Sequence, residues 1–260
     1  MSEESRRVPE LTEDQKNRLS QRLAMMRHDR ADVGQALPLT AAALSTSAAD
    51  DGGAARLEAL VAALATERVI VPIEVEPDPR ETGVHAGLSG DGHPAIDFVR
   101  ATTSAGEALA VYSSAAALAA HRSGDRPMAL DFRRIGLTAL VETGGRVVMD
   151  PGTASVLLPR PAVAALAQGD EWLPAWRDAE LLEELRTLAG VGAGSTGIVD
   201  VRLAYAGDGL VRVEILADAS VEERALRAAV AEAARRIGSS ARLIASADRI
   251  EIAPRLVRLS

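Results

Sequence analysis

Residues 107–176 constrain the fold most, because short apolar strands and short helices follow one another there with only turns between them. Pro161 at a first helical position and Gly169 beyond the last turn bracket one of the helices. An Asp-Pro-Gly turn at residues 150–152 separates two strands. This alternation is typical of an α/β fold. The predicted strands are residues 107–113, 127–132, 146–149 and 155–158, and the predicted helices are residues 115–121, 135–142 and 162–168.

The preceding segment adds a helix, a strand and a hairpin to the same domain. Apolar residues recur with the helical period in residues 55–67, which predicts an amphipathic helix. A strand follows over residues 69–75, and Pro72 places it at a sheet edge or a strand end, because proline cannot donate to a sheet ladder. Residues 95–101 and 107–113 are expected to pair as a hairpin.

A second small domain is predicted from residue 197 onward. Two segments of alternating apolar and polar residues are joined by a Gly-Asp-Gly turn, which indicates antiparallel strands with one buried face. Ser220 and Glu223 form a capping box before a helix that ends at Gly238 and buries Leu226. We expect a ββαββ layer with a mainly antiparallel sheet. Its predicted strands are residues 199–205, 211–215, 242–245 and 249–253.

The amino-terminal residues read as an extension outside these domains. Leu19, Leu23 and Met26 lie on one face of a predicted helix and are candidate partner-binding residues, although the helix could instead fold back on its own domain. Residues 29–53 read as a linker, so removal of residues 1–52 should leave the melting of the rest unchanged. The fold class is therefore α/β (α+β) with two small mixed-sheet domains. The predicted divisions are residues 1–53, 54–177, 178–196 and 197–260.

Composition and charge argue against several classes of function. The net charge of −8 repels phosphate backbones, so no nucleic-acid partner is expected. No apolar run approaches the roughly 20 residues that span a bilayer, and no membrane role is expected. The chain has no cysteine, which removes disulfides, thiol nucleophiles and thiolate metal sites. A cytoplasmic location is the default expectation.

Several segments resemble the SseB family, the enhanced-serine-sensitivity proteins. They are LAVYSSAAALAA at residues 109–120, VVMDPG at 147–152, LLPRPAVAALAQG at 157–169 and VIVPI at 69–73. The resemblance covers roughly residues 55–176, and residues 197–260 stand where the family's carboxy-terminal domain would be. Similarity to actinobacterial members, together with arginine-rich usage, suggests an actinobacterial source. The chain departs from the family in its long amino-terminal extension and in Asp150, where asparagine is more common.

Catalytic signatures are weak, and no catalytic, cofactor-binding or metal-binding residue is predicted. His121 with Ser113 or Ser114 and Asp131 has the residue types of a triad but lacks a nucleophile elbow. GAGSTG at residues 192–197 matches a dinucleotide fingerprint, but it follows a helix and precedes a strand, the reverse of what that site requires.

Two further groups have ordinary structural explanations. The spacing of the residues that have the chemistry of metal ligands matches no metal motif, and a surface loop explains them equally well. These residues are His85, Asp91, His93 and Asp97. Glu180, Glu183 and Glu184 are expected on the solvated side of a helix over residues 179–188.

Trp172 and Trp176 are the remaining candidate partner-binding residues, although tryptophans four residues apart also close cores and domain interfaces. The sequence therefore favours a non-catalytic protein-interaction or regulatory module with an unidentified protein partner, and it is compatible with a homo-oligomer. The alternative implied by the family name is a binding protein for a small molecule related to amino acids. An enzyme is the least favoured reading.

Overall fold

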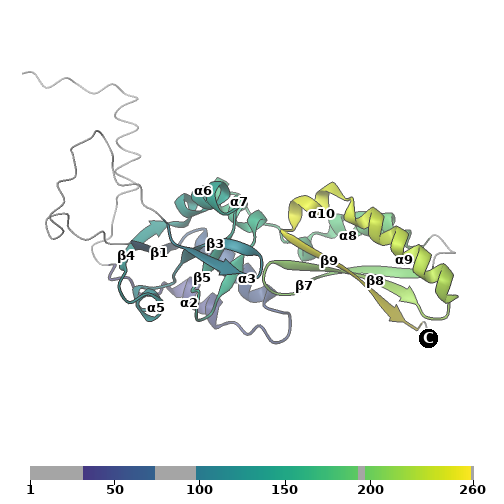
Figure 1. The fold of residues 1–260 in the computed structure, drawn as a ribbon, viewed down its shortest axis with the longest axis horizontal. Coiled ribbons are helices and arrows are strands. Elements are labelled where there is room, and N and C mark those ends of the chain that lie inside the picture. The colour runs from purple at the N-terminus through teal and green to yellow at the C-terminus, as the bar shows by residue number, and fades with distance from the viewer. Residues whose placement is uncertain (1–31, 74–97, 193–196, 259–260) are drawn as a thin grey trace, which may run out of the picture. The chain divides into compact units, whose positions relative to one another are not determined.

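The computed structural model describes residues 32–73, 98–192 and 197–258 (Figure 1). These residues contain both helices and strands, and the strands form three sheets. The predicted α/β class is confirmed. The described residues from Gly34 onward form one compact unit. No helix in the described part of the chain combines the length and apolar character needed to cross a lipid bilayer.

The largest sheet has the strand order β2-β3-β5-β6. β2 and β3 form the predicted hairpin, but its turn consists of Ser104 and Ala105 alone and not of residues 102–106. β3 runs parallel to β5, and β5 runs antiparallel to β6. The four strands are β2 (Arg100–Thr103), β3 (Gly106–Val111), β5 (Val147–Met149) and β6 (Val156–Leu158).

One face of this sheet packs on helices and forms the main core. Leu109, Val147 and Met149 point to this face and are buried among apolar side chains of the helices. The contributing helices are α2 (Pro38–Ser45), α3 (Ala54–Leu64), α6 (Phe132–Glu142) and α7 (Arg160–Gln168). Helix α5 (Ala115–His121) packs beside β1 instead, with Leu118 buried in a smaller cluster.

Strands β1 (Arg68–Ile73) and β4 (Arg126–Asp131) form a separate antiparallel pair. Pro72 lies opposite Pro127, so neither residue interrupts the ladder of a third strand. The edge position predicted for Pro72 is confirmed. A single bridge between Ile70 and Tyr112 joins this pair to the end of β3.

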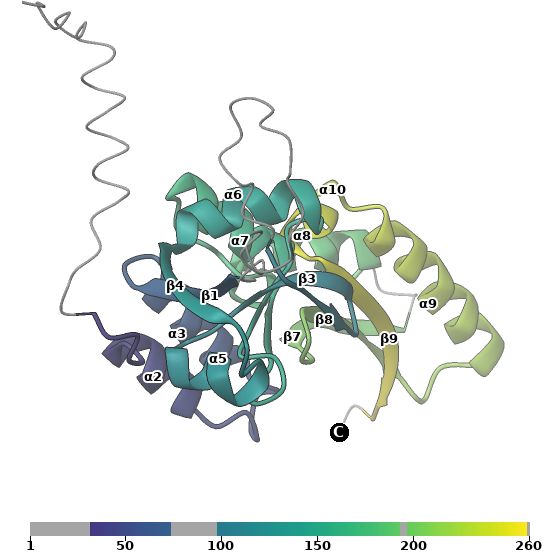
Figure 2. The ribbon, with the colours of Figure 1, turned by 60° about the vertical axis from the view of Figure 1, so that its left-hand side comes forward.

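The carboxy-terminal sheet has the order β7-β8-β9, with β7 (Ile198–Tyr205) antiparallel to β8 (Leu210–Asp218). β9 (Arg249–Val257) runs parallel to β8 (Figure 2). Between these strands lie α9 (Glu223–Gly238) and α10 (Ala241–Ser246), which provide the crossover that parallel strands require. With α8 (Ala179–Ala189), these helices bury one face of the sheet in a C-terminal core. The carboxy-terminal elements therefore follow one another as ββααβ, and the predicted ββαββ order is wrong.

Two local predictions in this region are wrong for identifiable reasons. Residues 242–245 form part of α10 instead of a strand, because Ser240 caps a helix by accepting a hydrogen bond from the Leu243 N–H, and Leu243 is buried. Ser220 does not cap α9. The Glu222 side chain takes that role, and it accepts hydrogen bonds from backbone N–H groups in the first turn of the helix.

The linker predicted over residues 29–53 is also corrected within its described part. Residues 38–45 form α2, which packs on α3 and buries Thr40 and Ala43. The Glu67 carboxylate accepts hydrogen bonds from the Leu39 and Thr40 N–H groups. These hydrogen bonds attach α2 to the residue that precedes β1.

Candidate functional site

A pocket of about 530 Å³ lies on the face of the β2-β3-β5-β6 sheet opposite the main core, and we call it the sheet pocket. Successive side chains of a strand point to opposite faces. Ala110, Val148 and Leu157 therefore point away from their buried neighbours in the main core and line the pocket floor. Ala101 of β2 extends the floor toward the sheet edge. The floor is apolar, and its alanines leave room above the sheet.

One end of the pocket is polar. The Tyr112 hydroxyl lies 2.9 Å from His121 Nδ1, at the end of α5. The His121 ring packs against Gly152, since a Cβ added to that glycine would lie 2.7 Å from His121 Cδ2. Arg122 lines the same end and forms an ion pair with Asp125.

Tyr112 stays protonated in this setting. The residue is fully buried, and burial raises the pKa of its phenol above the ordinary value. The nearby Arg122 guanidinium acts in the opposite direction, while Asp125 and Asp150 reinforce the rise. A buried hydroxyl needs a hydrogen-bond partner, and His121 Nδ1 lies within reach of it.

Asp150 holds the turn that brings Gly152 to the pocket. Its backbone has φ +50°, a conformation that aspartate tolerates better than most residues, and its side chain is buried. The Asp150 carboxylate accepts a hydrogen bond of 2.7 Å from the Ser113 N–H. The backbone carbonyl of Asp150 accepts another from the Ser155 N–H. Aspartate therefore performs a definite structural role in this turn.

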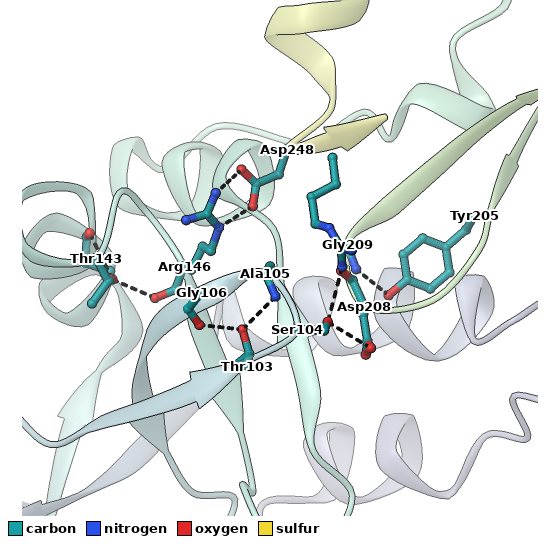
Figure 3. Close-up of polar contacts among 12 residues, drawn as sticks. Thr103, Ser104, Ala105, Gly106, Thr143, Arg146, Tyr205, Asp208, Gly209 and Asp248 are labelled. Carbon is teal, nitrogen blue, oxygen red and sulfur yellow. Dashed lines mark hydrogen bonds and ion pairs between the residues drawn. The ribbon is translucent and has the colours of Figure 1, made fainter. Parts of the chain in front are cut away.

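The opposite end of the pocket is formed by two turns that meet (Figure 3). The Ser104 hydroxyl, in the β2–β3 turn, lies 3.0 Å from an Asp208 carboxylate oxygen in the β7–β8 turn. Arg249 donates to Ser104 Oγ and to the Asp208 carbonyl oxygen, each at 3.2 Å. We call this group the rim contact.

Close to the rim contact, a bidentate ion pair joins the residue before β5 to the residue before β9. Arg146 donates to both oxygens of Asp248, at 2.7 and 3.0 Å (Figure 3). The Asp248 side chain is only 3% exposed. This arginine fork, paired with a buried carboxylate, therefore joins the residue before β5 to the residue before β9 by a charge-assisted bidentate contact.

Comparison with known families settles the relationship of this chain. Residues 41–165 match the family model of the SseB protein N-terminal domain. The chain belongs to the SseB family. Comparison with curated proteins gave no match, and neither did comparison with solved structures. The SseB match contains the pocket floor and the His121 end, whereas Asp208 lies beyond it. The actinobacterial source stays a prediction.

The two tryptophans of this SseB protein lie where its two cores meet. Trp172 packs on the main core, and Trp176 packs on both cores. Their rings meet edge to face with centroids 5.7 Å apart, and the Trp176 ring contacts the Tyr205 ring in a tilted arrangement with centroids 4.9 Å apart. The Glu58 carboxylate accepts a hydrogen bond from the Trp176 indole. This arrangement matches the core-closing alternative, and partner binding by these residues stays a prediction.

The residues considered for a catalytic triad do not form one. His121 Nδ1 is paired with Tyr112, as described above. The Ser114 hydroxyl caps α5 by accepting from the Ala117 N–H, and the Asp131 carboxylate caps α6 by accepting from the Arg133 N–H. His121, Ser114 and Asp131 each already have a structural hydrogen bond.

The remaining candidates fall into two groups. In the part of the chain that the structure describes, no cluster of three or more metal-ligating side chains is present. His85, Asp91, His93 and Asp97 lie outside the described residues, as do Leu19, Leu23 and Met26. Residues 193–196 of the glycine-rich segment also lie outside the described residues, and the described elements on either side are helix α8 and strand β7, in the order predicted.

The acidic side chains of α8 form contacts with other side chains, whereas the sequence predicted only a solvated face. Glu180 forms an ion pair with Arg242, and Glu183 forms one with Arg186. The Ser240 hydroxyl donates to Glu184. These carboxylates connect α8 to α10 or to their own helix.

Sequence reasoning missed the sheet pocket. The available signal was the alternation of alanine with larger residues in β3, where Ala108 and Ala110 share one face. The sequence singles out His121, but with the wrong partners, because only the fold brings Tyr112 and Gly152 to it.

Proposed function

We propose that this SseB protein is a non-catalytic regulatory module that binds a small molecule in the sheet pocket. The observation that carries the proposal is the pocket itself, with its apolar floor and a polar group of side chains at each end. Its volume lies within the range of roughly 300–1,000 Å³ that is usual for ligand sites. A cytoplasmic location belongs to the same proposal and agrees with the absence of cysteine.

The hydrogen bonds of the candidate catalytic groups support a binding role over a chemical one. An activated nucleophile needs a base within hydrogen-bond reach. Here His121 is bonded to a phenol whose pKa is raised by burial, and Ser114 serves as a helix cap. These contacts favour a pocket that holds a molecule without transforming it.

The proposal is tested by filling the pocket. Ala101→Leu places a larger side chain on the floor, and Ala228→Leu adds the same side chain to an exposed position on α9. We expect the parent and the α9 variant to show ligand-dependent rises in Tm and shifts of pocket amide signals. The screen begins with serine and related amino acids. A filled variant that responds like the parent, or a broad panel without any response, would contradict the proposal.

The protein-interaction role predicted from the sequence is a second candidate, and helix α6 favours it. Leu137 and Val141 lie one turn apart and are 53% and 86% exposed. We expect a Leu137→Gln/Val141→Gln variant to lose proteins captured from the host by the parent chain. Leu173→Gln changes another exposed apolar residue and serves as the control. Identical capture by all three would count against this surface.

A further inference from the structure

The Tyr112–His121 hydrogen bond determines which nitrogen of the imidazole carries the proton. Among the described residues, His121 Nδ1 is the hydrogen-bond partner of the buried Tyr112 hydroxyl. Leaving a buried O–H without an acceptor costs roughly 1–3 kcal/mol, so the phenol donates and Nδ1 accepts. A neutral imidazole whose Nδ1 accepts must carry its proton on Nε2.

The protonated nitrogen faces the pocket wall. His121 Nε2 would lie 3.2 Å from a Cβ placed on Gly152, and both residues line the pocket. The neighbouring Arg122 guanidinium also lines this end, and such a group can only donate. The His121 end therefore offers the donor groups of His121 and Arg122, the latter paired with Asp125, whereas the Asp208 carboxylate stands at the other end.

We propose that the His121 end of the sheet pocket binds the acceptor group of a ligand, a carboxylate or an amide carbonyl, through Nε2–H. The apolar body of the ligand then lies on Ala110, Val148 and Leu157. Tyr112 also lines this end of the pocket, and it is a positioning residue because its hydroxyl fixes the tautomer of His121. This inference rests on the proposed function and names the chemical class that the pocket selects.

The tautomer can be measured without any ligand. Long-range ¹H–¹⁵N spectra of the histidine rings, assigned with a His121→Gln variant, should show His121 in the Nε2–H form at a pH where it is neutral. Tyr112→Phe removes the hydroxyl and should return the ring to a mixture of tautomers. An Nδ1–H form in the parent chain, or no change in Tyr112→Phe, would overturn the positioning role.

The ligand class is tested with butyrate, butyramide and butylammonium, which share one apolar body. Butyrate and butyramide should shift the amide signals of His121 and Gly152, and butylammonium should leave those signals in place. His121→Phe keeps a ring but lacks Nε2–H, and it should weaken butyrate binding about ten- to a hundredfold, the value of one hydrogen bond to a charged group.

The outcomes separate this inference from the function beneath it. If all three probes shift the His121 end equally, or if butylammonium binds there most tightly, the acceptor assignment is wrong and the pocket remains a binding site. If no probe shifts any pocket signal at saturating concentration, and no compound of the wider panel does so either, both the assignment and the proposed function are wrong. Retained butyrate binding in His121→Phe would also refute the assignment.

Discussion

Gly152 is the residue at which the pocket is most sensitive to a small change. Its φ is +90°, and a Cβ there would meet the His121 ring at 2.7 Å. Gly169 has a similar φ of +81°, but a Cβ at that residue would have no atom within 4 Å. Gly169→Ala should therefore cost about 1–2 kcal/mol through backbone strain alone. Gly152→Ala should cost more in urea denaturation and shift the His121 ring signals, and equal losses would contradict the close contact.

Glu222 caps α9 with a carboxylate, which makes the cap depend on pH. Hydrogen bonds from the Arg224 and Ala225 N–H groups hold the pKa of Glu222 below its ordinary value. A lowered folded-state pKa means that the stabilisation is complete above the ordinary pKa and is lost as pH falls through the folded value. At pH 7 the Tm of Glu222→Gln should be lower than the Tm of the parent, and this difference in Tm should vanish at acidic pH. Ser220→Ala is the control and should have little effect at either pH.

At the scale of single elements, α9 depends on a side chain that is almost entirely buried. Leu226 is 7% exposed and packs against the position of Gly197. Leu226→Ala should cost about 2–5 kcal/mol by opening a cavity. Leu256→Ala, at a 66% exposed position of β9, is the matched control and should change little. Urea denaturation of the two variants provides the measurement. Equal midpoints would show that Leu226 does not lie on the buried face of α9.

Elements with local signals were predicted from sequence, and those that depend on distant partners were not. α7 is marked by Pro161 and Gly169, and both of its ends are predicted within two residues. The stretch that forms α10 is too short for its period to distinguish helix from strand. β9 is predicted as a strand, but its parallel pairing with β8 depends on contacts across the whole of α9 and α10.

The candidate site shows the same division. The sequence marks Asp150 and Gly152 as a turn and singles out His121 as a polar residue at the end of a helix. It carries no local signal that Tyr112 binds His121, or that Asp208 reaches Ser104 from another sheet. These pairs arise only when the strands have been arranged.

At the scale of the whole molecule, Arg146 and Asp248 should act as a unit. Asp248→Ala leaves a partly buried guanidinium without its partner and should cost about 1.5–3 kcal/mol. Adding Arg146→Met should recover part of the loss, because no unpaired charge then remains. A double-mutant cycle measured by urea denaturation gives the coupling energy. Strictly additive losses would show that the two side chains do not stabilise the junction together.

Removal of residues 1–52 should lower Tm by several degrees, contrary to the expectation from sequence alone. The deletion takes away α2, with its buried Thr40 and Ala43, and the Asp51 carboxylate that accepts from the Gly53 and Ala55 N–H groups. A thermal-denaturation comparison of the two chains decides the question. An unchanged Tm would show that α2 adds nothing to the sheet domain.

The parallel pairing of β8 with β9 also sets an order of events during synthesis. The β2–β3 hairpin can close as soon as its two strands exist, whereas β8 must wait until α9 and α10 have been made. Until β9 arrives, one edge of β8 is open, and open strand edges associate with other chains. A nascent chain that has passed β8 but not β9 should therefore associate with other chains more readily than the complete chain does.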